Sequence, residues 1–466
     1  MNEAVGSTGS IARRGETSAT ADVLHDAWRQ TVHANPAAPA LMDAAQGRIW
    51  TREEIDTAAS IWAAKHGEAL RGMTVALAEP NGAEWLQVFL GLAKSRAVIL
   101  PLDPGDPREV QRATAAAVGA TFLWREHALE PLAVGRRPRR HAGRLIKLTS
   151  GSTGAPRALI FTDRELMADG RQVSAAMGIR PEDINLGLIP WGHSYGLGNL
   201  ILPLLQQGTA IVFGAAPLPH AIATAIQTWR PTVFPAVPAL LRALAEAAIP
   251  VETLASLRTI ISAGAPLAIE VAQAFATRFQ RNVHSFYGSS ETGGISFDRT
   301  GDSAASGRGV GQLIPGVTVE FQRSGRFTVT SPAVFSIGNR RPGTHRMADI
   351  ARLEPSGELV LLGRAGRFVK IAGRRLNLAE VEQALKQVPG VKDALVTPHA
   401  ERADALAAAL ATTCNSSEIR RELRTRLAPW KIPKRMLILP EFPLTSRGKT
   451  DTRRLRVLLN ATAVAE

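Results

Sequence analysis

The spacing of apolar positions along the chain predicts which segments fold as helices and which as strands. Between residues 21 and 70 apolar side chains recur at helical spacing, as at Leu24, Trp28 and Val32, which predicts amphipathic helices. Asp22 and Thr51 can cap such helices. After residue 70, short apolar runs at 74–77, 97–100 and 121–124 predict strands, and the segments 84–94 and 108–118 between them predict helices. This alternation indicates a parallel sheet covered by helices.

The alternation continues through the segments that begin at Pro231 and Leu257, and two strands joined at Pro355-Ser356-Gly357 follow it. The last hundred residues have a different order of elements. Their pattern predicts a helix over 378–386, a strand over 394–397, a helix over 417–427 and a strand over 436–439. We therefore expect an α/β protein with a large domain over residues 21–363 and a small α+β domain over residues 364–466.

The composition fits a globular protein with a substantial core, since 45% of its 466 residues are hydrophobic. No apolar run reaches the roughly 18 residues of a membrane helix, so no membrane span is expected. Residues 1–20 are rich in Gly, Ser, Thr and Ala without an apolar centre, which predicts a disordered tail rather than a signal peptide. The single cysteine, Cys414, excludes an intrachain disulfide. Together these features predict a cytoplasmic protein.

Basic residues outnumber acidic ones by 55 to 41, which gives a formal net charge of +14. Such an excess can attract nucleic acid, anionic small molecules or an acidic protein. The sequence has no zinc-finger spacing, no basic–aromatic RNA signature and no basic heptad region, so nucleic acid is not the expected partner. The charge alone does not select between anionic small molecules and an acidic protein.

A cluster of small hydroxyl residues and glycines follows the apolar run 145–148. It reads Thr149-Ser150-Gly151-Ser152-Thr153-Gly154 and is followed by Ala155-Pro156-Arg157. Small residues let the backbone approach a ligand closely, and their amides and hydroxyls, together with a guanidinium, suit a polyphosphate. A flexible Ser/Gly linker is the alternative that composition alone allows. The strand before the cluster and the Pro-Arg after it favour a phosphate loop.

A second motif offers an aromatic face, a glycine turn and one carboxylate, in the order Phe286-Tyr287-Gly288-Ser289-Ser290-Glu291-Thr292-Gly293. An aromatic face can stack on adenine, and a carboxylate can hold Mg²⁺ against phosphate oxygens. A polar loop with a capping glutamate is the alternative. With the C-terminal sequence Pro443-Leu444-Thr445-Ser446-Arg447-Gly448-Lys449, the order of motifs resembles the adenylate-forming superfamily. That superfamily contains acyl- and aryl-CoA ligases, peptide-synthetase adenylation domains and luciferases, and the resemblance covers nearly the whole chain after residue 20.

The resemblance implies ATP and Mg²⁺ as ligands and assigns their contacts residue by residue. Residues 149–154 would cradle the β- and γ-phosphates, and Gly264-Ala265-Pro266 would lie along the adenine edge, with Tyr287, Gly288 and Ser290 beside it. Asp349 would bind both ribose hydroxyls, and Arg364 would help to hold the nucleotide. Glu291, together with Thr149, would bind Mg²⁺. Lys449 would bridge the carboxylate and the α-phosphate. Without the resemblance, Asp349 would be read as an exposed strand end and Lys449 as a solvated cation.

His193 lies in the turn Pro190-Trp191-Gly192-His193-Ser194-Tyr195-Gly196. A lone histidine is commonly structural, but this turn resembles the His-x-x-Gly turn of acyl- and aryl-CoA ligases, whose histidine lies beside the carboxylate pocket. Relatives that activate amino acids place an aspartate nearby, and here no acidic residue occurs between Asp183 and Phe213. The resemblance therefore implies a fatty or aromatic carboxylic acid rather than an α-amino acid.

The implied reaction is the ATP-dependent activation of this acid to an acyl-adenylate, followed by transfer to a thiol. Coenzyme A is the favoured thiol, the phosphopantetheine of a separate acyl carrier protein is the first alternative, and a catalytically silent nucleotide-binding homologue is the second. The resemblance also implies a β-rich subdomain in the large domain, built on parallel and mixed sheets, and a small mobile domain that carries the catalytic Lys449. Two residues depart from the family pattern. Arg157, which we count among the catalytic residues, stands where lysine is usual, and Gly366 stands where the hinge aspartate is usual.

Overall fold

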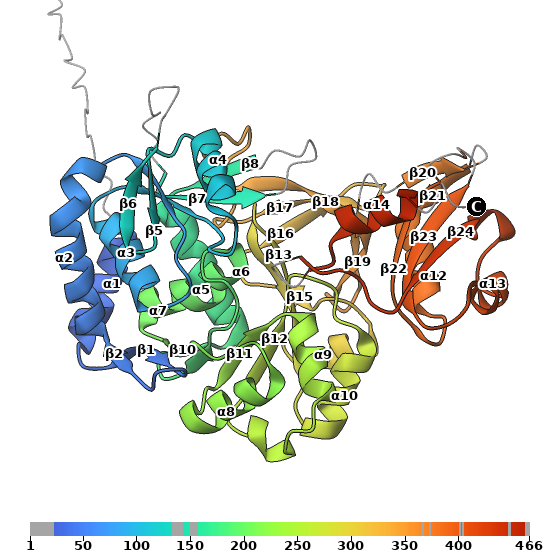
Figure 1. The fold of residues 1–466 in the computed structure, drawn as a ribbon, viewed down its shortest axis with the longest axis horizontal. Coiled ribbons are helices and arrows are strands. Elements are labelled where there is room, and N and C mark those ends of the chain that lie inside the picture. Colours follow the sequence, from blue (N-terminus) through green and yellow to red (C-terminus); the bar gives the residue numbers. More distant parts are fainter. Residues whose placement is uncertain are drawn as a thin grey trace, which may run out of the picture.

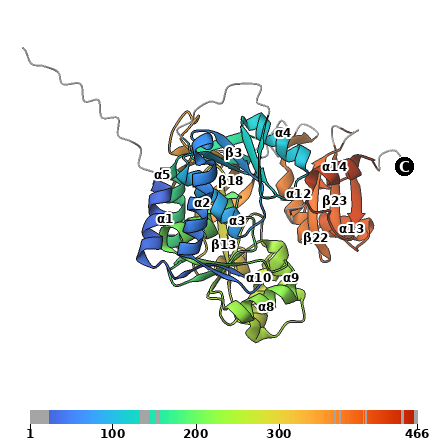
Figure 2. The same ribbon diagram turned by 60° about the vertical axis from the view of Figure 1, so that its left-hand side comes forward.

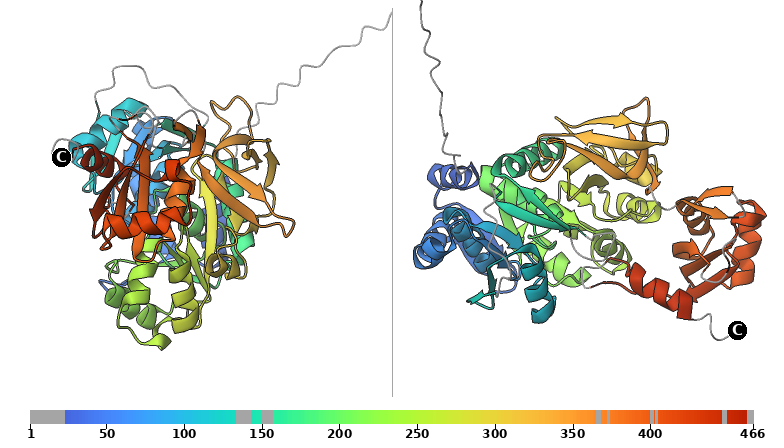
Figure 3. Two further views of the ribbon diagram at one scale, coloured as in Figure 1. Left: turned by 90° about the vertical axis from the view of Figure 1, so that its right-hand side faces the viewer. Right: turned by 90° about the horizontal axis from the view of Figure 1, so that it is seen from above.

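The protein is described here by a computed structural model that covers residues 23–132, 143–149, 157–364, 368–371, 374–399, 402, 405–445 and 449–461. Three sheets form the large body coloured blue to yellow in Figure 1, and the residues after 364 form a smaller orange and red body beside it. Figure 2 and Figure 3 show the same two bodies from other directions. This arrangement confirms the predicted α/β class with a large N-terminal part and a small C-terminal part. No helix in the described ranges is long and apolar enough to cross a membrane.

A nine-stranded sheet lies at the centre of the large body. Its six middle strands are parallel, and the strands added at its two edges pair antiparallel. In sheet order the strands are β15 (Gln312–Leu313), β14 (Gly293–Phe297), β13 (Val283–Ser289), β12 (Thr259–Ser262), β11 (Val233–Ala236), β9 (Ile184–Leu186), β10 (Ala210–Phe213), β1 (Pro39–Asp43) and β2 (Ile49–Thr51).

A six-stranded sheet packs beside it and contains the strands expected after residue 70. Its order is β6 (Ala128–Pro131), β5 (Phe122–Arg125), β3 (Thr74–Leu77), β4 (Val98–Pro101), β7 (Leu145–Thr149) and β8 (Arg157–Phe161). The middle four strands are parallel, and the two edge strands are antiparallel. The three predicted strands are confirmed, each within one residue of its expected bounds.

Helices cover both faces of the sheets, which explains why the strands are nearly continuous apolar runs. They are α1 (Val23–Ala34), α2 (Arg52–Leu70), α3 (Ala83–Lys94), α4 (Arg108–Val118), α5 (Asp163–Met177), α6 (Ser194–Gly196), α7 (Leu202–Gln207), α8 (Pro219–Trp229), α9 (Pro238–Glu246), α10 (Ile269–Phe279) and α11 (Asp302–Ser306), with a π-helical turn η1 (Leu197–Ile201) and a 3-10 turn η2 (Val251–Leu254). Thr51 caps α2 as expected, because its side chain accepts from the amide of Glu54 and the Glu54 carboxylate accepts from the Thr51 amide. The other expected cap, Asp22, lies outside the described residues.

The core forms two main layers on opposite faces of the nine-stranded sheet. The larger layer lies between the two sheets and contains Trp28, Trp85 and Trp191, all nearly or fully buried, with side chains from α1, α2, α3, α5 and α7. The second layer lies under α8, α9 and α10, which cover the other face (Figure 1). Neighbouring residues of β12 divide between them, since Ile260 packs in the second layer and Ile261 in the first.

The rest of the large body is an antiparallel sheet of β16 (Thr318–Phe321), β17 (Arg326–Thr330), β18 (Thr344–Leu353) and β19 (Leu359–Arg364), in agreement with the expected β-rich subdomain. The small body contains β20 (Phe368–Ile371), β21 (Arg374–Asn377), α12 (Leu378–Lys386), β22 (Val391–Pro398), β23 (Leu406–Thr412), α13 (Ser416–Arg424), η3 (Pro429–Lys431), β24 (Arg435–Leu439) and α14 (Thr452–Ala461). Cys414 lies between β23 and α13, with its sulfur 3.5 Å from the carbonyl oxygen of Pro389.

Two expectations for the small body need correction. The helix predicted over 417–427 ends at Arg424, and Thr425 is its C-cap. β23 was not predicted, because four of its seven residues are alanine, and alanine favours helices over strands. The predicted domain boundary between 363 and 364 falls at the last residue of β19, and it stays a prediction.

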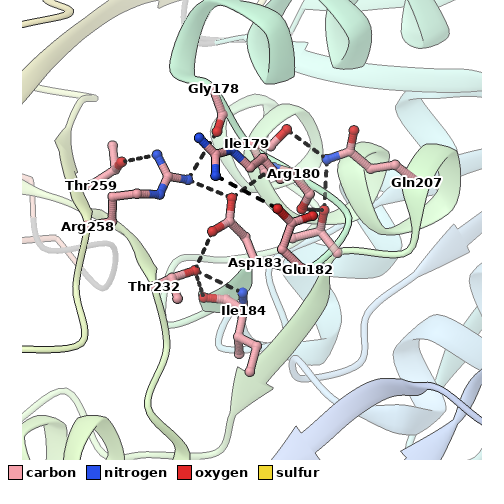
Figure 4. Close-up of polar contacts among 11 residues, drawn as sticks. Gly178, Ile179, Arg180, Glu182, Asp183, Ile184, Gln207, Thr232, Arg258 and Thr259 are labelled. Atoms are coloured by element: carbon pink, nitrogen blue, oxygen red, sulfur yellow. Dashed lines mark hydrogen bonds and ion pairs between the residues drawn. The ribbon is translucent and has the colours of Figure 1, made fainter.

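A polar network lies just before the first residues of β9, β11 and β12, which are central strands of the nine-stranded sheet (Figure 4). Asp183, which is 5% exposed, accepts through Oδ1 from the Thr232 hydroxyl over 2.7 Å. Its Oδ2 accepts from Nη2 of Arg258 over 2.6 Å and from the amide of Arg180 over 2.8 Å. One carboxylate therefore joins the loop after α5 to the loops that lead into two neighbouring strands.

Candidate active site

Several motif residues that the structure describes lie at or just after the carboxyl ends of strands in the parallel parts of the two larger sheets. Thr149 is the last residue of β7, and Tyr287 and Gly288 lie near the end of β13. Gly264 follows the end of β12, and His193 follows β9. Ligands of parallel α/β sheets bind at the carboxyl ends of the strands. The predicted loop residues Ser150, Gly151, Ser152, Thr153 and Gly154 lie outside the described residues.

Lys449 reaches the turn at the end of β12. Gly264 has a φ of +83°, and a Cβ added to it would lie 4.0 Å from Cε of Lys449. Ala265 and Pro266 are exposed beside it. The backbone of Lys449 is held by Thr445, because the amide of Thr445 donates to the Lys449 carbonyl over 2.7 Å. The structure thus brings together a predicted residue of the small body and a predicted turn of the large one.

Tyr287 and Asp349 are in direct contact. The hydroxyl of Tyr287 donates to Oδ2 of Asp349 over 2.6 Å. Asp349 in β18 also pairs in register with Arg364 in β19, so three of the predicted nucleotide residues lie on adjoining positions. Gly288 is required by close packing, since a Cβ there would stand 2.5 Å from the carbonyl oxygen of Gly293.

Glu291 is half-buried in the turn between β13 and β14, near several charged groups. Its carboxylate acts electrostatically on His345 of β18 and on the buried Lys147 of β7. Burial lowers the pKa of His345, and the charge of Arg157 lowers it further, while Glu291 opposes both. Arg157 lies 5.9 Å from the ring centre of Phe335, whose ring is in turn 5.9 Å from that of His345. Arg157 and Glu291, predicted from separate motifs, therefore act on the same imidazole.

The donor set at Glu291 fits a magnesium ion that is shared with phosphate oxygens. Within the described ranges, no three His, Cys, Asp or Glu side chains gather into a group that could hold a metal by itself. Mg²⁺ is commonly bound through one or two carboxylates together with substrate phosphates, and it keeps several waters. Glu291 offers one carboxylate of this kind.

His193 is the N-cap residue of the short helix α6 and is half-buried. Gly196 must be glycine, because a Cβ there would stand 2.1 Å from the carbonyl oxygen of Pro190. The hydroxyl of Tyr195 lies 3.3 Å from the carbonyl oxygens of both Ala236 and Ile261, which end or nearly end β11 and β12. Burial raises the pKa of Tyr195 well above its ordinary value, so this phenol stays protonated and can donate. These contacts anchor the His193 turn at the same edge as Gly264.

Sequence reasoning missed three ionisable residues near these motifs: Lys147, Asp169 and His345. One signal was available, because Lys147 is a charged residue inside the apolar run of β7, and a buried charge requires a partner. Nothing in the sequence pattern identifies that partner, which comes from α5.

Comparison with known proteins agrees with this geometry. The family model described as AMP-binding enzyme matches residues 136–322, and the model described as AMP-binding enzyme C-terminal domain matches residues 380–449, together more than half of the chain. The chain belongs to the AMP-binding enzyme family. The match confirms the predicted superfamily and the predicted enzyme class, an AMP-forming acid–thiol ligase.

The chain is similar to CoA synthases that it covers over most of their length, and to short parts of much longer synthases. Feruloyl-CoA synthase from an Amycolatopsis species is 28% identical over 432 residues, which cover 81% of this chain and 87% of that protein. A linear gramicidin synthase from Brevibacillus parabrevis is 27% identical over 443 residues, which cover 82% of this chain but 6% of the synthase. The ATP-bound structure of MatB from Rhodopseudomonas palustris has the same fold, with a TM-score of 0.78 and 21% identity over 94% of this chain and 99% of MatB.

Proposed function

We propose that this chain activates a carboxylic acid with ATP and transfers the acyl group to a thiol, with coenzyme A as the favoured acceptor. The position of Lys449 at the Gly264 turn carries this proposal. This cation of the small body lies beside the turn that follows β12, Tyr287 and Asp349 are hydrogen-bonded to each other, and Glu291 lies in the turn between β13 and β14. Such an arrangement suits a reaction in which two anions must be brought together.

In the first half-reaction a carboxylate oxygen of the acid attacks the α-phosphorus of ATP. The bond from that phosphorus to the bridging oxygen breaks, and pyrophosphate leaves. Catalysis then consists mainly of positioning and charge neutralisation. Tyr287 and Asp349 would hold the nucleoside, residues 149–154 and Arg157 the phosphates, and Glu291 the Mg²⁺. Lys449 would neutralise the carboxylate and the α-phosphate as they combine.

In the second half-reaction the sulfur of the thiol attacks the acyl carbon, AMP leaves and the thiol proton is lost to solvent. The position of Lys449 in this structure suits the first half-reaction. The turn that holds Lys449 would then withdraw to admit the thiol, which requires the small body to move relative to the large one about the connection near Arg364.

The acid is proposed to be fatty or aromatic rather than an α-amino acid. The turn after β9 that contains His193 has no acidic side chain to pair with a substrate ammonium. Several relatives carry names that refer to aromatic acids, among them feruloyl-CoA synthase and a salicylyl-CoA synthase. Aromatic acids therefore come first in a substrate panel, followed by fatty acids.

A separate carrier protein is the second candidate for the thiol donor. The match to a linear gramicidin synthase and the net charge of +14 support it, because an acidic carrier would be attracted to a basic ligase. A catalytically silent homologue is less well supported, since the chain has both Glu291 and Lys449.

The test measures pyrophosphate release with ATP, Mg²⁺ and a panel of acids, with and without coenzyme A. Acid-dependent release that turns over repeatedly only with coenzyme A would support the CoA ligase, and release that stalls with coenzyme A would favour a carrier protein. Lys449→Ala is expected to lower acid-dependent release by about 100-fold or more. The exposed Lys434, on the same small body, supplies the control Lys434→Ala, which should stay near wild type. Unchanged release in Lys449→Ala would contradict the proposed mechanism.

A further inference from the structure

Lys147 and Asp169 form a buried ion pair next to the strand end that leads into the predicted phosphate loop. Nζ of Lys147 lies 3.9 Å from Oδ2 of Asp169, and the two side chains are only 3% and 4% exposed. The ammonium also lies 4.3 Å from the ring centre of Phe161 in the neighbouring strand β8. Burial lowers the pKa of Lys147, whereas the carboxylates of Asp169, Glu165 and Glu291 oppose this shift.

Asp169 has a second partner in the turn that carries Glu291. Its Oδ1 accepts from the amide of Gly294 over 3.0 Å. Gly293 has a φ of +69°, and a Cβ there would stand 2.2 Å from the same oxygen, so only glycine lets the turn approach this carboxylate. Gly293 is two residues after Glu291, and Asp169 therefore fixes the end of the Glu291 turn.

Asp169 also packs against the helical segment that follows the His193 turn. A Cβ on Gly198 in η1 would lie 3.3 Å from Oδ2 of Asp169. One carboxylate on α5 thus contacts β7, β14 and η1, each of which adjoins a different site motif. An apolar side chain at position 147 would pack with Leu145 and Phe161 without the desolvation penalty of a buried charge, and replacing a buried ion pair by apolar residues is often neutral or stabilising. A gain in folding stability therefore does not explain why the chain has a buried ion pair at this place.

We propose that the Lys147–Asp169 pair is a positioning element that holds Thr149, at the end of β7, in register with the Glu291 turn, and so sets the affinity of the site for the triphosphate of Mg-ATP. The inference rests on the proposed function, since it takes Thr149 and Glu291 as contacts of the phosphates and the metal. AMP lacks the β- and γ-phosphates, so its binding is expected to be insensitive to the pair.

The test compares direct binding of two nucleotides, which requires neither an acid nor turnover. The main variant is Lys147→Met with Asp169→Asn, because the double change leaves no unpaired buried charge and Asn keeps an oxygen for the amide of Gly294. Calorimetric titration with a non-hydrolysable ATP analogue plus Mg²⁺ is expected to show affinity weakened by about tenfold or more. AMP should bind within about twofold of wild type.

The matched control uses a second ion pair between the same two segments of chain. Arg144, just before β7, donates from Nε to Oδ2 of Asp163 at the start of α5 over 3.0 Å. The double variant Arg144→Met with Asp163→Asn is expected to change thermal stability without a selective loss of the ATP analogue.

Two results would overturn the inference: equal weakening of AMP and the ATP analogue in the Lys147/Asp169 variant, or no weakening of either. Wild-type chain that binds the ATP analogue but releases no pyrophosphate with any acid would count against the proposed function and leave this inference standing. Wild-type chain that binds neither nucleotide would overturn both.

Discussion

The hydroxyl of Tyr287 donates to the carboxylate of Asp349 over 2.6 Å, although the two residues are 62 positions apart in the chain. The bond joins the end of β13 in the nine-stranded sheet to β18 in the antiparallel sheet. It therefore fixes the orientation of the carboxylate that we propose for the ribose, relative to the ring that we propose for adenine.

Removing this hydroxyl should weaken nucleotide binding while the ring stays in place. Tyr287→Phe is expected to raise the dissociation constant of AMP by about tenfold, since a hydrogen bond to a charged group contributes about 1.5 kcal/mol or more. A double-mutant cycle with Asp349→Asn, read by calorimetric titration, is the check. Strictly additive losses in the double variant would contradict a role for the bond itself.

The stability of the protein should depend on pH through His345. Its pKa lies below the ordinary value of 6.5, chiefly because burial disfavours the imidazolium, so the unfolded chain binds a proton more readily than the folded one. The stability that neutral His345 contributes is fully present above pH 6.5 and is lost as the pH falls from there towards the folded-state pKa. Urea unfolding at a series of pH values should show this slope.

The slope should become flatter in His345→Gln, which cannot take up the proton. The exposed His33 supplies the matched control, and His33→Gln should keep the wild-type dependence. An equal change of slope in both variants would contradict the assignment to His345.

The network around Asp183 should stabilise the fold without affecting the reaction, because it lies at the sheet edge opposite the candidate site. Asp183→Ala removes three hydrogen bonds of a buried carboxylate and is expected to lower the free energy of unfolding by about 3 kcal/mol. The neighbouring Glu182, which is exposed and 3.9 Å from Arg180, is the control, and Glu182→Ala should change it by about 0.5 kcal/mol or less. Urea unfolding measures both. An altered KM for ATP in folded Asp183→Ala would contradict the prediction that the Asp183 network affects stability alone.

The parts of the fold that could be predicted are those whose pattern is local. α4 and α12 have the predicted bounds, because a helix with one apolar face repeats that face along its own length. β23 could not be predicted, because its strand conformation depends on pairing with β22 on one side and β24 on the other. Its own alanine-rich sequence does not favour a strand. Local periodicity carries no information about such neighbours.

The candidate site also has parts that the sequence can predict and parts that it cannot. The motifs around Gly264 and Tyr287 could be located from sequence through their resemblance to the adenylate-forming superfamily, because the pattern of apolar residues alone marks Gly264 only as a turn after a strand. The contact of Lys449 with Gly264 and the pairing of Lys147 with Asp169 could not be located, because both depend on how distant segments pack. The sequence pattern marks Lys147 as unusual, and only the fold supplies the carboxylate that explains it.

Cys414 offers a place to attach a dye that reports the position of the small body. It is the only thiol in the chain, and it lies between β23 and α13. A maleimide dye would therefore attach at one place without prior removal of other cysteines. With a fluorescent nucleotide as the second chromophore, the efficiency of energy transfer between them would test the proposed movement of the small body between the two half-reactions.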